Sequence, residues 1–228
     1  IALAAVGGYG RGELSPGSDL DILFLHTGKI TQEKLKAVVN DLLYPLWDKN
    51  TVDHSVRTRG ETRDAAAIDI RVATGLLDIR LIAGNAQLVA AVQGDSLEFW
   101  RKDTKRNLPE LEKVLTQRHE RAGELAYLLE PDLKEARGGL RDIQALRAIA
   151  LSGAVHVPLE KISWAESTLN NVREALHTAS GRGKDRLLFQ EQDKVAKILD
   201  YKDADAMMSD VARAARSVDY LLDYTWHA

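Results

Sequence analysis

The strongest pattern of apolar and polar positions lies at the start of the chain. Residues 3–6 are an apolar run that predicts a strand, and residues 18–25 predict a second strand that begins with Asp19 and Asp21. Side chains alternate between the two faces of a strand, so both aspartates share one face while the apolar residues next to them point into the core. A cluster of glycines separates the two strands, and we expect it to form a turn.

An amphipathic helix and a third strand are predicted next. Apolar residues recur at three- and four-residue steps from Leu35 to Trp47, and Thr31 is placed to cap this helix at its N-terminus. Pro45 is expected to end or bend the helix early. Residues 51–58 then alternate as in a short strand.

The rest of the chain is predicted to be helical. A helix over residues 62–83 would stop at Gly84 and Asn85. The further helical stretches are 86–93, 95–106, 109–126, 139–152, 165–180, 186–201 and 204–226. The predicted fold class is α+β: a small α/β domain with a mixed sheet over residues 1–93, followed by an all-α helical bundle over residues 94–228. We expect a ligand-binding cleft between the two domains.

Composition excludes several classes of protein. The chain has 228 residues, of which 45% are hydrophobic and 29% charged, as in a soluble globular protein. The net charge of −3 offers no basic field for nucleic acid, and no apolar run is long enough to span a membrane. The absence of cysteine fits a reducing cytoplasm. Because the chain begins with Ile1 inside a strand-like run and ends on an unfinished helical pattern, we expect it to be a piece of a longer protein.

The glycines and aspartates at the start of the chain suit a metal-bound triphosphate. Two carboxylates at the spacing of Asp19 and Asp21 can hold one Mg²⁺ or two close ions, as enzymes that displace phosphoryl or nucleotidyl groups do. Gly7 and Gly8 let backbone N–H groups approach a polyphosphate, and Arg11 offers a charged fork for phosphate oxygens. The glycine cluster alone could be a tight turn, and the aspartate pair alone could be solvated. Their combination favours the nucleotide site.

Two better-known glycine motifs are excluded. The chain contains no G-x-x-x-x-G-K-[ST] sequence, so it has no P-loop. Pro16 and Gly17 follow the glycine cluster too closely for the long helix of a Rossmann unit to begin there.

Three segments carry a resemblance to a known family. Residues 7–21, GGYGRGELSPGSDLD, resemble the signature of the DNA polymerase β-like nucleotidyltransferase superfamily. Residues 54–58, HSVRT, and residues 130–144, EPDLKEARGGLRDIQ, narrow this to a resemblance to the PII-protein uridylyltransferases. The resemblance implies transfer of UMP from UTP, or of AMP from ATP, to a tyrosine hydroxyl of the PII nitrogen-regulatory protein. Pyrophosphate would be released, and the reaction would depend on two Mg²⁺ ions.

The resemblance also implies roles for residues at the start of the chain. The β and γ phosphates would lie on the turn of Gly7 and Gly8, with further contacts from Arg11 and Ser18. Asp19 and Asp21 would hold the magnesium ions and act as catalytic residues.

The resemblance also implies a third carboxylate, on the strand after the first long helix. Asp53 stands at the right point in the order and is the candidate for a catalytic and metal-binding role. A strand-edge aspartate facing water is the alternative, and Asp69 on the next predicted helix is the fallback.

In the 130–144 segment, Lys134 and Arg141 are candidate nucleotide-binding residues. They concentrate positive charge near the start of a predicted helix, where anions are favoured, and the resemblance places them across the cleft from the aspartates. A buried ion pair between Arg141 and Asp142 that shapes the turn is an equal alternative.

Two other functions compete with uridylyl transfer. One is an adenylyltransferase that acts on PII or on another protein. The other is a catalytically silent module that senses a nucleotide or binds a partner. The chain contains no His-Asp dipeptide, so we do not expect the nucleotide-removing activity of the family within it.

Overall fold

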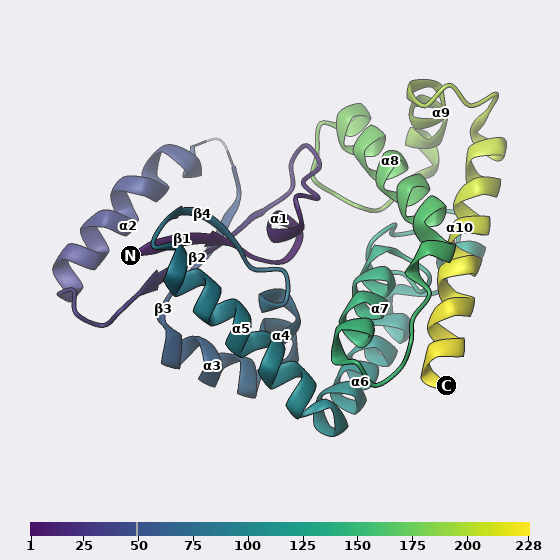
Figure 1. Ribbon diagram of the computed structural model, residues 1–228. Helices are drawn as coiled ribbons and strands as arrows, with labels where there is room; N and C mark the ends of the chain where they lie inside the picture. The colour runs from purple at the N-terminus through teal and green to yellow at the C-terminus, as the bar shows by residue number, and fades with distance from the viewer. Residues whose placement is uncertain (49) are drawn as a thin grey trace. The chain divides into compact units, whose positions relative to one another are not determined.

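The computed structural model describes residues 1–48 and 50–228, and it divides into two compact units (Figure 1). The first unit is Ile1–Asp103 and the second is Thr104–Ala228. The boundary predicted after residue 93 falls inside helix α5 (Ala86–Lys102), which contacts strands and helices of the first unit. The whole of this helix therefore belongs to the first unit.

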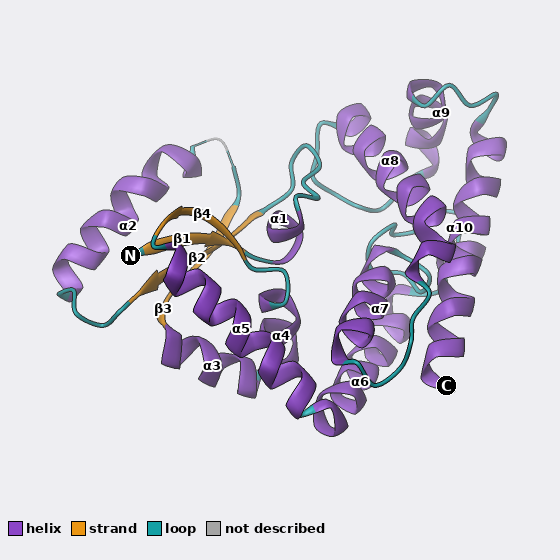
Figure 2. Cartoon of the chain, viewed as in Figure 1, coloured by secondary structure: helices purple, strands orange, loops and turns teal. Residues whose placement is uncertain are grey.

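A four-stranded sheet forms the centre of the first unit (Figure 2), and it is mixed, as predicted. The strand order is β3 (Val52–Thr58), β2 (Leu20–His26), β1 (Ala2–Ala5) and β4 (Arg80–Gly84). β1 runs antiparallel to both β2 and β4, while β2 and β3 run parallel.

Helix α2 (Gln32–Trp47) covers one face of this sheet. Ile22 and Phe24 of β2 point to that face and pack against Val39 and Leu43 of the helix, forming one buried cluster. Thr31 is the N-cap, as predicted, and its hydroxyl accepts a hydrogen bond from the Lys34 N–H at 3.5 Å.

Of the two outcomes predicted at Pro45, an early end or a bend, the early end is wrong, because α2 continues to Trp47. Proline at this position lacks the N–H that would bond four residues back, and Leu43 remains fully buried two residues earlier. The packing of the helix on the sheet therefore outweighs the lost hydrogen bond.

The single helix predicted over residues 62–83 is also wrong. The structure has two helices there, α3 (Arg59–Ile68) and α4 (Ile70–Leu76), and then strand β4. Asp69 takes an extended conformation that ends α3, and its side chain caps α4 by accepting the Arg71 N–H at 2.8 Å. β4 is a strand because it pairs with β1, a contact between distant parts of the chain that no local pattern reveals.

The predicted end of a helix at Gly84 and Asn85 is wrong, because Gly84 ends strand β4 and Asn85 begins the next helix. The Asn85 side chain accepts a hydrogen bond from the Leu88 N–H at 3.1 Å and caps α5. α5 runs without a break through Gly94 and joins the predicted helix 86–93 to most of the predicted helix 95–106, whose last residues belong to α6 (Thr104–Ala122). A Cβ on Gly94 would meet nothing within 4 Å, so the glycine lies on an open side of the helix.

The second unit is all-helical, as predicted. Its long helices are α6 (Thr104–Ala122), α7 (Leu140–Ser152), α8 (Ser163–Ser180), α9 (Phe189–Ile198) and α10 (Ala204–Trp226). Helix α8 contacts both α9 and α10, and α7 contacts α6, α8 and α10. No helix in the described part of the chain is both long and apolar enough to cross a membrane.

Candidate functional site

The glycine-rich segment after β1 folds against the carboxylate of Asp21. It forms a short helix, α1 (Gly7–Arg11), where the sequence predicts a turn. Gly7 has a positive φ of 54°, which favours glycine. A Cβ at this position would lie 3.3 Å from Oδ2 of Asp21, and the Val6 N–H donates to the Asp21 carbonyl at 3.1 Å. Two of the predicted site residues, Gly7 and Asp21, are therefore neighbours.

Asp53 lies beside Asp21 in the sheet. The parallel register of β2 and β3 pairs these two residues directly, so their side chains leave the same face. Asp19 immediately precedes β2 and is exposed, as is Asp53, while Asp21 is half-buried. The three predicted carboxylates thus come from the same end of two adjacent strands.

The chemistry of this donor set suits magnesium, which prefers carboxylate oxygens. Across residues 1–48 and 50–228, however, no three acidic or histidine side chains gather in a way that could hold a metal ion. The backbone register brings the carboxylates to one place, while their oxygens do not converge on one point.

Asp69, the fallback carboxylate, has a structural task. It caps α4 and its side chain also accepts from Nε of Arg71 at 3.2 Å. Partial burial opposes ionisation, yet the hydrogen bonds from Arg71 hold the pKa of Asp69 below its usual range. These contacts give the Asp69 carboxylate a role in ending α3 and starting α4 that requires no metal ion.

Arg11 and Ser18 support the glycine segment and the loop after it. The Arg11 side chain is only 11% exposed; its Nε donates to Glu13 at 2.7 Å and its Nη1 to Asp78. The Ser18 hydroxyl accepts the Ser15 N–H at 3.0 Å and so closes the turn before Asp19. Phosphate contacts from either residue stay predictions.

Two residues of this region, Asp78 and Arg80, are not predicted from the sequence. Asp78 lies just before β4 and Arg80 is its first residue, in the stretch where the sequence pattern predicts a helix. Asp78 binds Arg11, and Arg80 donates to the carbonyls of Tyr9 and Gly10 at 2.8 and 3.0 Å. The signal that could have pointed to them is Gly10, where a Cβ would overlap the Asp78 carbonyl.

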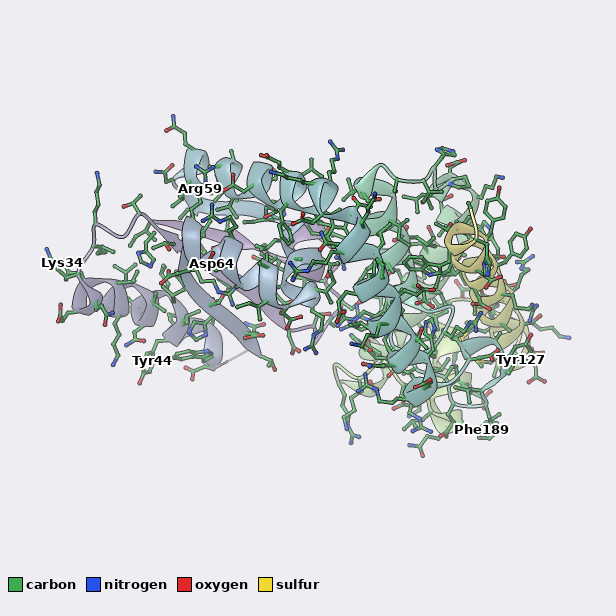
Figure 3. The ribbon with its side chains drawn as sticks, turned by 90° about the horizontal axis from the view of Figure 1, so that it is seen from below. Lys34, Tyr44, Arg59, Asp64, Tyr127 and Phe189 are labelled. Carbon is green, nitrogen blue, oxygen red and sulfur yellow. The ribbon has the colours of Figure 1, made fainter. Side chains whose placement is uncertain are left out.

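His54 belongs to an aromatic cluster on the α2 side of the sheet. Its ring centroid lies 6.4 Å from that of Phe24 and 6.0 Å from that of Trp47, and Trp47 in turn contacts Tyr44. Figure 3 shows Tyr44 at the outer surface of α2. Because neighbouring strand residues face opposite sides, the His54 side chain leaves the sheet on the face away from Asp53.

In the second unit, Lys134 and Arg141 each lie near a carboxylate. Nζ of Lys134 is 3.8 Å from Oδ2 of Asp185, and Nε of Arg141 donates to Glu135 at 3.2 Å. Arg141 therefore pairs with Glu135, while the Asp142 carboxylate has other partners. Nucleotide contacts by Lys134 and Arg141 stay predictions.

Asp142 fastens the turn before α7. Its fully buried carboxylate accepts from Arg118, from Nε2 of His119 at 2.9 Å and from the Gly138 N–H at 2.6 Å. Burial alone would raise the pKa of Asp142, but the His119 hydrogen bond and the Arg118 charge hold it below its usual range.

A second largely buried aspartate fastens the start of the same segment. Asp185 accepts from Nε of Arg173 at 2.6 Å and from Nε2 of His177 at 2.9 Å, and its carbonyl accepts the Leu133 N–H at 2.9 Å. Burial opposes ionisation here too, but His177 and Arg173 keep the pKa of Asp185 low. The Gly138 N–H and the charged side chains of Lys134, Arg141 and Asp142 thus all interact with groups of the second unit itself.

Two known protein families match this chain, one in the first unit and one in the second. Residues 1–69, which contain the glycine segment and the candidates Asp19, Asp21 and Asp53, match the family described as a nucleotidyltransferase domain. Residues 106–152 and 156–226 match the family described as GlnD PII-uridylyltransferase. This chain belongs to the PII-uridylyltransferase family. The resemblance carried by residues 7–21 and 130–144 is therefore confirmed.

Several relatives in this family carry the name bifunctional uridylyltransferase/uridylyl-removing enzyme. The Streptomyces coelicolor protein is 51% identical over 99% of this chain and 27% of its own length. The Mycobacterium tuberculosis protein is 41% identical over 96% of this chain and 28% of its own length. The Corynebacterium glutamicum protein is 34% identical over 96% of this chain and 31% of its own length. The chain thus spans less than a third of the length of these PII-uridylyltransferase relatives.

Proposed function

We propose that this chain transfers a nucleoside monophosphate, UMP from UTP, to a tyrosine hydroxyl of a PII signalling protein. The observation that carries the proposal is the nearness of Gly7 to the Asp21 carboxylate, which a Cβ on Gly7 would approach to 3.3 Å, beside Asp53 on the adjacent strand. A glycine backbone that can approach phosphate thereby stands next to carboxylates that can hold its counter-ion. The family and the names of the relatives support the choice of reaction.

The residues divide the task between binding and orientation. The segment of Gly7 and Gly8 accepts the β and γ phosphates, with Ser18 and Arg11 adding contacts or support. Asp19 and Asp21, with Asp53 as third carboxylate, would hold Mg²⁺. When bound, this ion neutralises the phosphate charge and assists the attacking and leaving oxygens.

The reaction needs no covalent intermediate on the protein. The tyrosine oxygen of the acceptor forms a bond to the α phosphorus, the bond from that phosphorus to the bridging oxygen breaks, and pyrophosphate leaves with the electron pair. The phenol proton passes to solvent. The contribution of the chain is to align the two substrates and to hold the carboxylates in place.

The test is transfer of labelled nucleotide to a purified PII protein in the presence of Mg²⁺. We expect label from UTP on PII, lost by roughly 100-fold or more in the double variant Asp19→Asn, Asp21→Asn, because the carboxylates that hold the ion are gone. Asp64→Asn is the matched control, because Asp64 is an exposed aspartate of helix α3 in the same unit (Figure 3).

The outcomes separate the competing functions. Label from ATP in place of UTP would assign adenylyl transfer, the second candidate. Tight triphosphate binding with no transfer to PII would instead support a silent sensing module. Equal losses in the double variant and in Asp64→Asn would count against a role for the aspartates.

A further inference from the structure

We propose that Asp78 and Arg80 form a clamp that sets the position of the glycine segment against Asp21, and that Arg80 is a positioning residue for triphosphate binding. The inference rests on the proposed function, because the glycine segment is the proposed phosphate site. The clamp itself is a set of contacts within the first unit, defined by Asp78 and Arg80 on one side and by residues 9–11 of α1 on the other.

Arg80 binds the carbonyl end of α1. Its Nε donates to Gly10 O at 3.0 Å and its Nη2 to Tyr9 O at 2.8 Å. The guanidinium also lies over the Tyr9 ring, with Cζ 5.5 Å from the centroid. Since peptide groups are planar, fixing two successive carbonyls fixes the orientation of the backbone that joins them.

Asp78 binds the same helix by two further contacts. Its carboxylate accepts from Nη1 of Arg11, and its backbone carbonyl lies so close to Gly10 that a Cβ there would overlap it. Gly10 is buried and is required for this approach of two backbones. The segment from Asp78 to Arg80 therefore contacts α1 at its backbone, at two of its carbonyls and at the Arg11 side chain.

The opposite end of α1 faces the candidate site. Gly7, at the start of this five-residue helix, lies against Oδ2 of Asp21. A helix this short has little stability of its own and takes its position from its contacts. Movement of α1 away from Asp78 and Arg80 would therefore change the distance between the glycine backbone and the Asp21 carboxylate.

The first test measures the clamp without any ligand. Hydrogen–deuterium exchange of the backbone amides in residues 6–13 is compared between the unaltered protein and Arg80→Ala. Because two hydrogen bonds are lost, we expect exchange in this segment to quicken about tenfold in Arg80→Ala, and to be partly restored in Arg80→Lys, which keeps one donating group. Arg63→Ala is the control, because Arg63 is an exposed arginine of α3 whose Nε lies 3.9 Å from the Asp64 carboxylate.

The second test links the clamp to nucleotide binding. In Arg80→Ala we expect KM for UTP to rise about tenfold while kcat at saturating UTP changes less than about twofold, again with partial rescue by Arg80→Lys. A merely structural role would reduce the folded fraction, which lowers kcat and leaves KM unchanged, and that result would overturn the positioning role.

The two tests also separate this inference from the proposed function. Unchanged exchange in residues 6–13 of Arg80→Ala would overturn the clamp, whatever the activity. If the unaltered protein binds no nucleoside triphosphate, yet Arg80→Ala loosens residues 6–13, the proposed function fails and the clamp remains.

Discussion

At the scale of single residues, Gly7 is the constrained glycine that lies nearest the candidate carboxylates. Its backbone requires a positive φ, and its missing Cβ leaves room for the Asp21 carboxylate. Gly12, at the end of the same short helix, has a φ of 76°, but a Cβ there would meet nothing within 4 Å. The two glycines therefore share the conformational requirement and differ in their surroundings.

This difference predicts the outcome of two alanine substitutions. Gly7→Ala and Gly12→Ala should each reduce the free energy of unfolding by about 1–2 kcal/mol, the usual cost of a left-handed conformation for alanine. Only Gly7→Ala should also raise KM for UTP, because its methyl group displaces Asp21. Urea denaturation and steady-state kinetics measure the two effects, and equal kinetics in both variants would contradict the role of Gly7.

At the scale of elements, the 130–144 segment is held by buried charge. Asp142 connects α6, through Arg118 and His119, to the turn before α7. Arg118 also donates to the Glu135 carbonyl at 3.1 Å, so the same guanidinium holds two points of the segment. In contrast, the pair of Arg141 and Glu135 is about half exposed.

Removing one partner from each pair should therefore have unequal effects. Asp142→Asn leaves Arg118 buried without its counter-charge, and we expect a loss of about 3–5 kcal/mol in unfolding free energy. Glu135→Gln, the exposed counterpart, should cost less than about 1 kcal/mol. Urea denaturation followed by helical circular dichroism distinguishes them, and similar losses would show that burial does not govern this segment.

Glycine also serves the packing between elements in the second unit. Gly138 has a φ of 83°, and a Cβ there would lie 2.5 Å from the Ala215 carbonyl of α10. For Gly139, the Cβ would lie 2.7 Å from the Ala136 carbonyl. Gly138 thus permits close contact with a helix far along the chain, and Gly139 lets the turn before α7 fold tightly on its own backbone.

At the scale of the whole molecule, the buried carboxylates predict how stability depends on pH. Asp142 faces Arg118 and His119, and Asp185 faces Arg173, His177 and Lys134. Both have pKa values below the usual range when folded. Their contribution to stability is therefore complete above the unfolded pKa of about 4 and is lost as the pH falls toward the lower folded values.

We accordingly expect the second unit to unfold more readily as the pH drops below about 4. The measurement is the urea midpoint at a series of pH values, with Asp142→Asn and Asp185→Asn as comparisons. Each variant lacks one of the shifted carboxylates, so its acid dependence should be shallower. A midpoint that falls as steeply in both variants would place the acid sensitivity in other groups.

Local signals in the sequence predicted much of this molecule. The first strands, the Thr31 cap, the all-helical second unit and the family follow from alternation, periodicity, capping residues and the 7–21 and 130–144 motifs. These features depend on neighbours a few positions apart, so they can be read along the chain. The same motif led us to expect the glycines and Asp21 close together, as they are, while their use as a nucleotide site stays a prediction.

Contacts between distant residues were decided only by the tertiary structure. β4 is a strand because β1 offers it a hydrogen-bonding edge, and Arg80 reaches the glycine helix only because that strand forms. The side-chain partners of Asp142, Arg118 and His119, likewise come from another helix, not from the adjacent Arg141. Local sequence determines which residues can do the chemistry, whereas register and packing across the chain decide which of them meet.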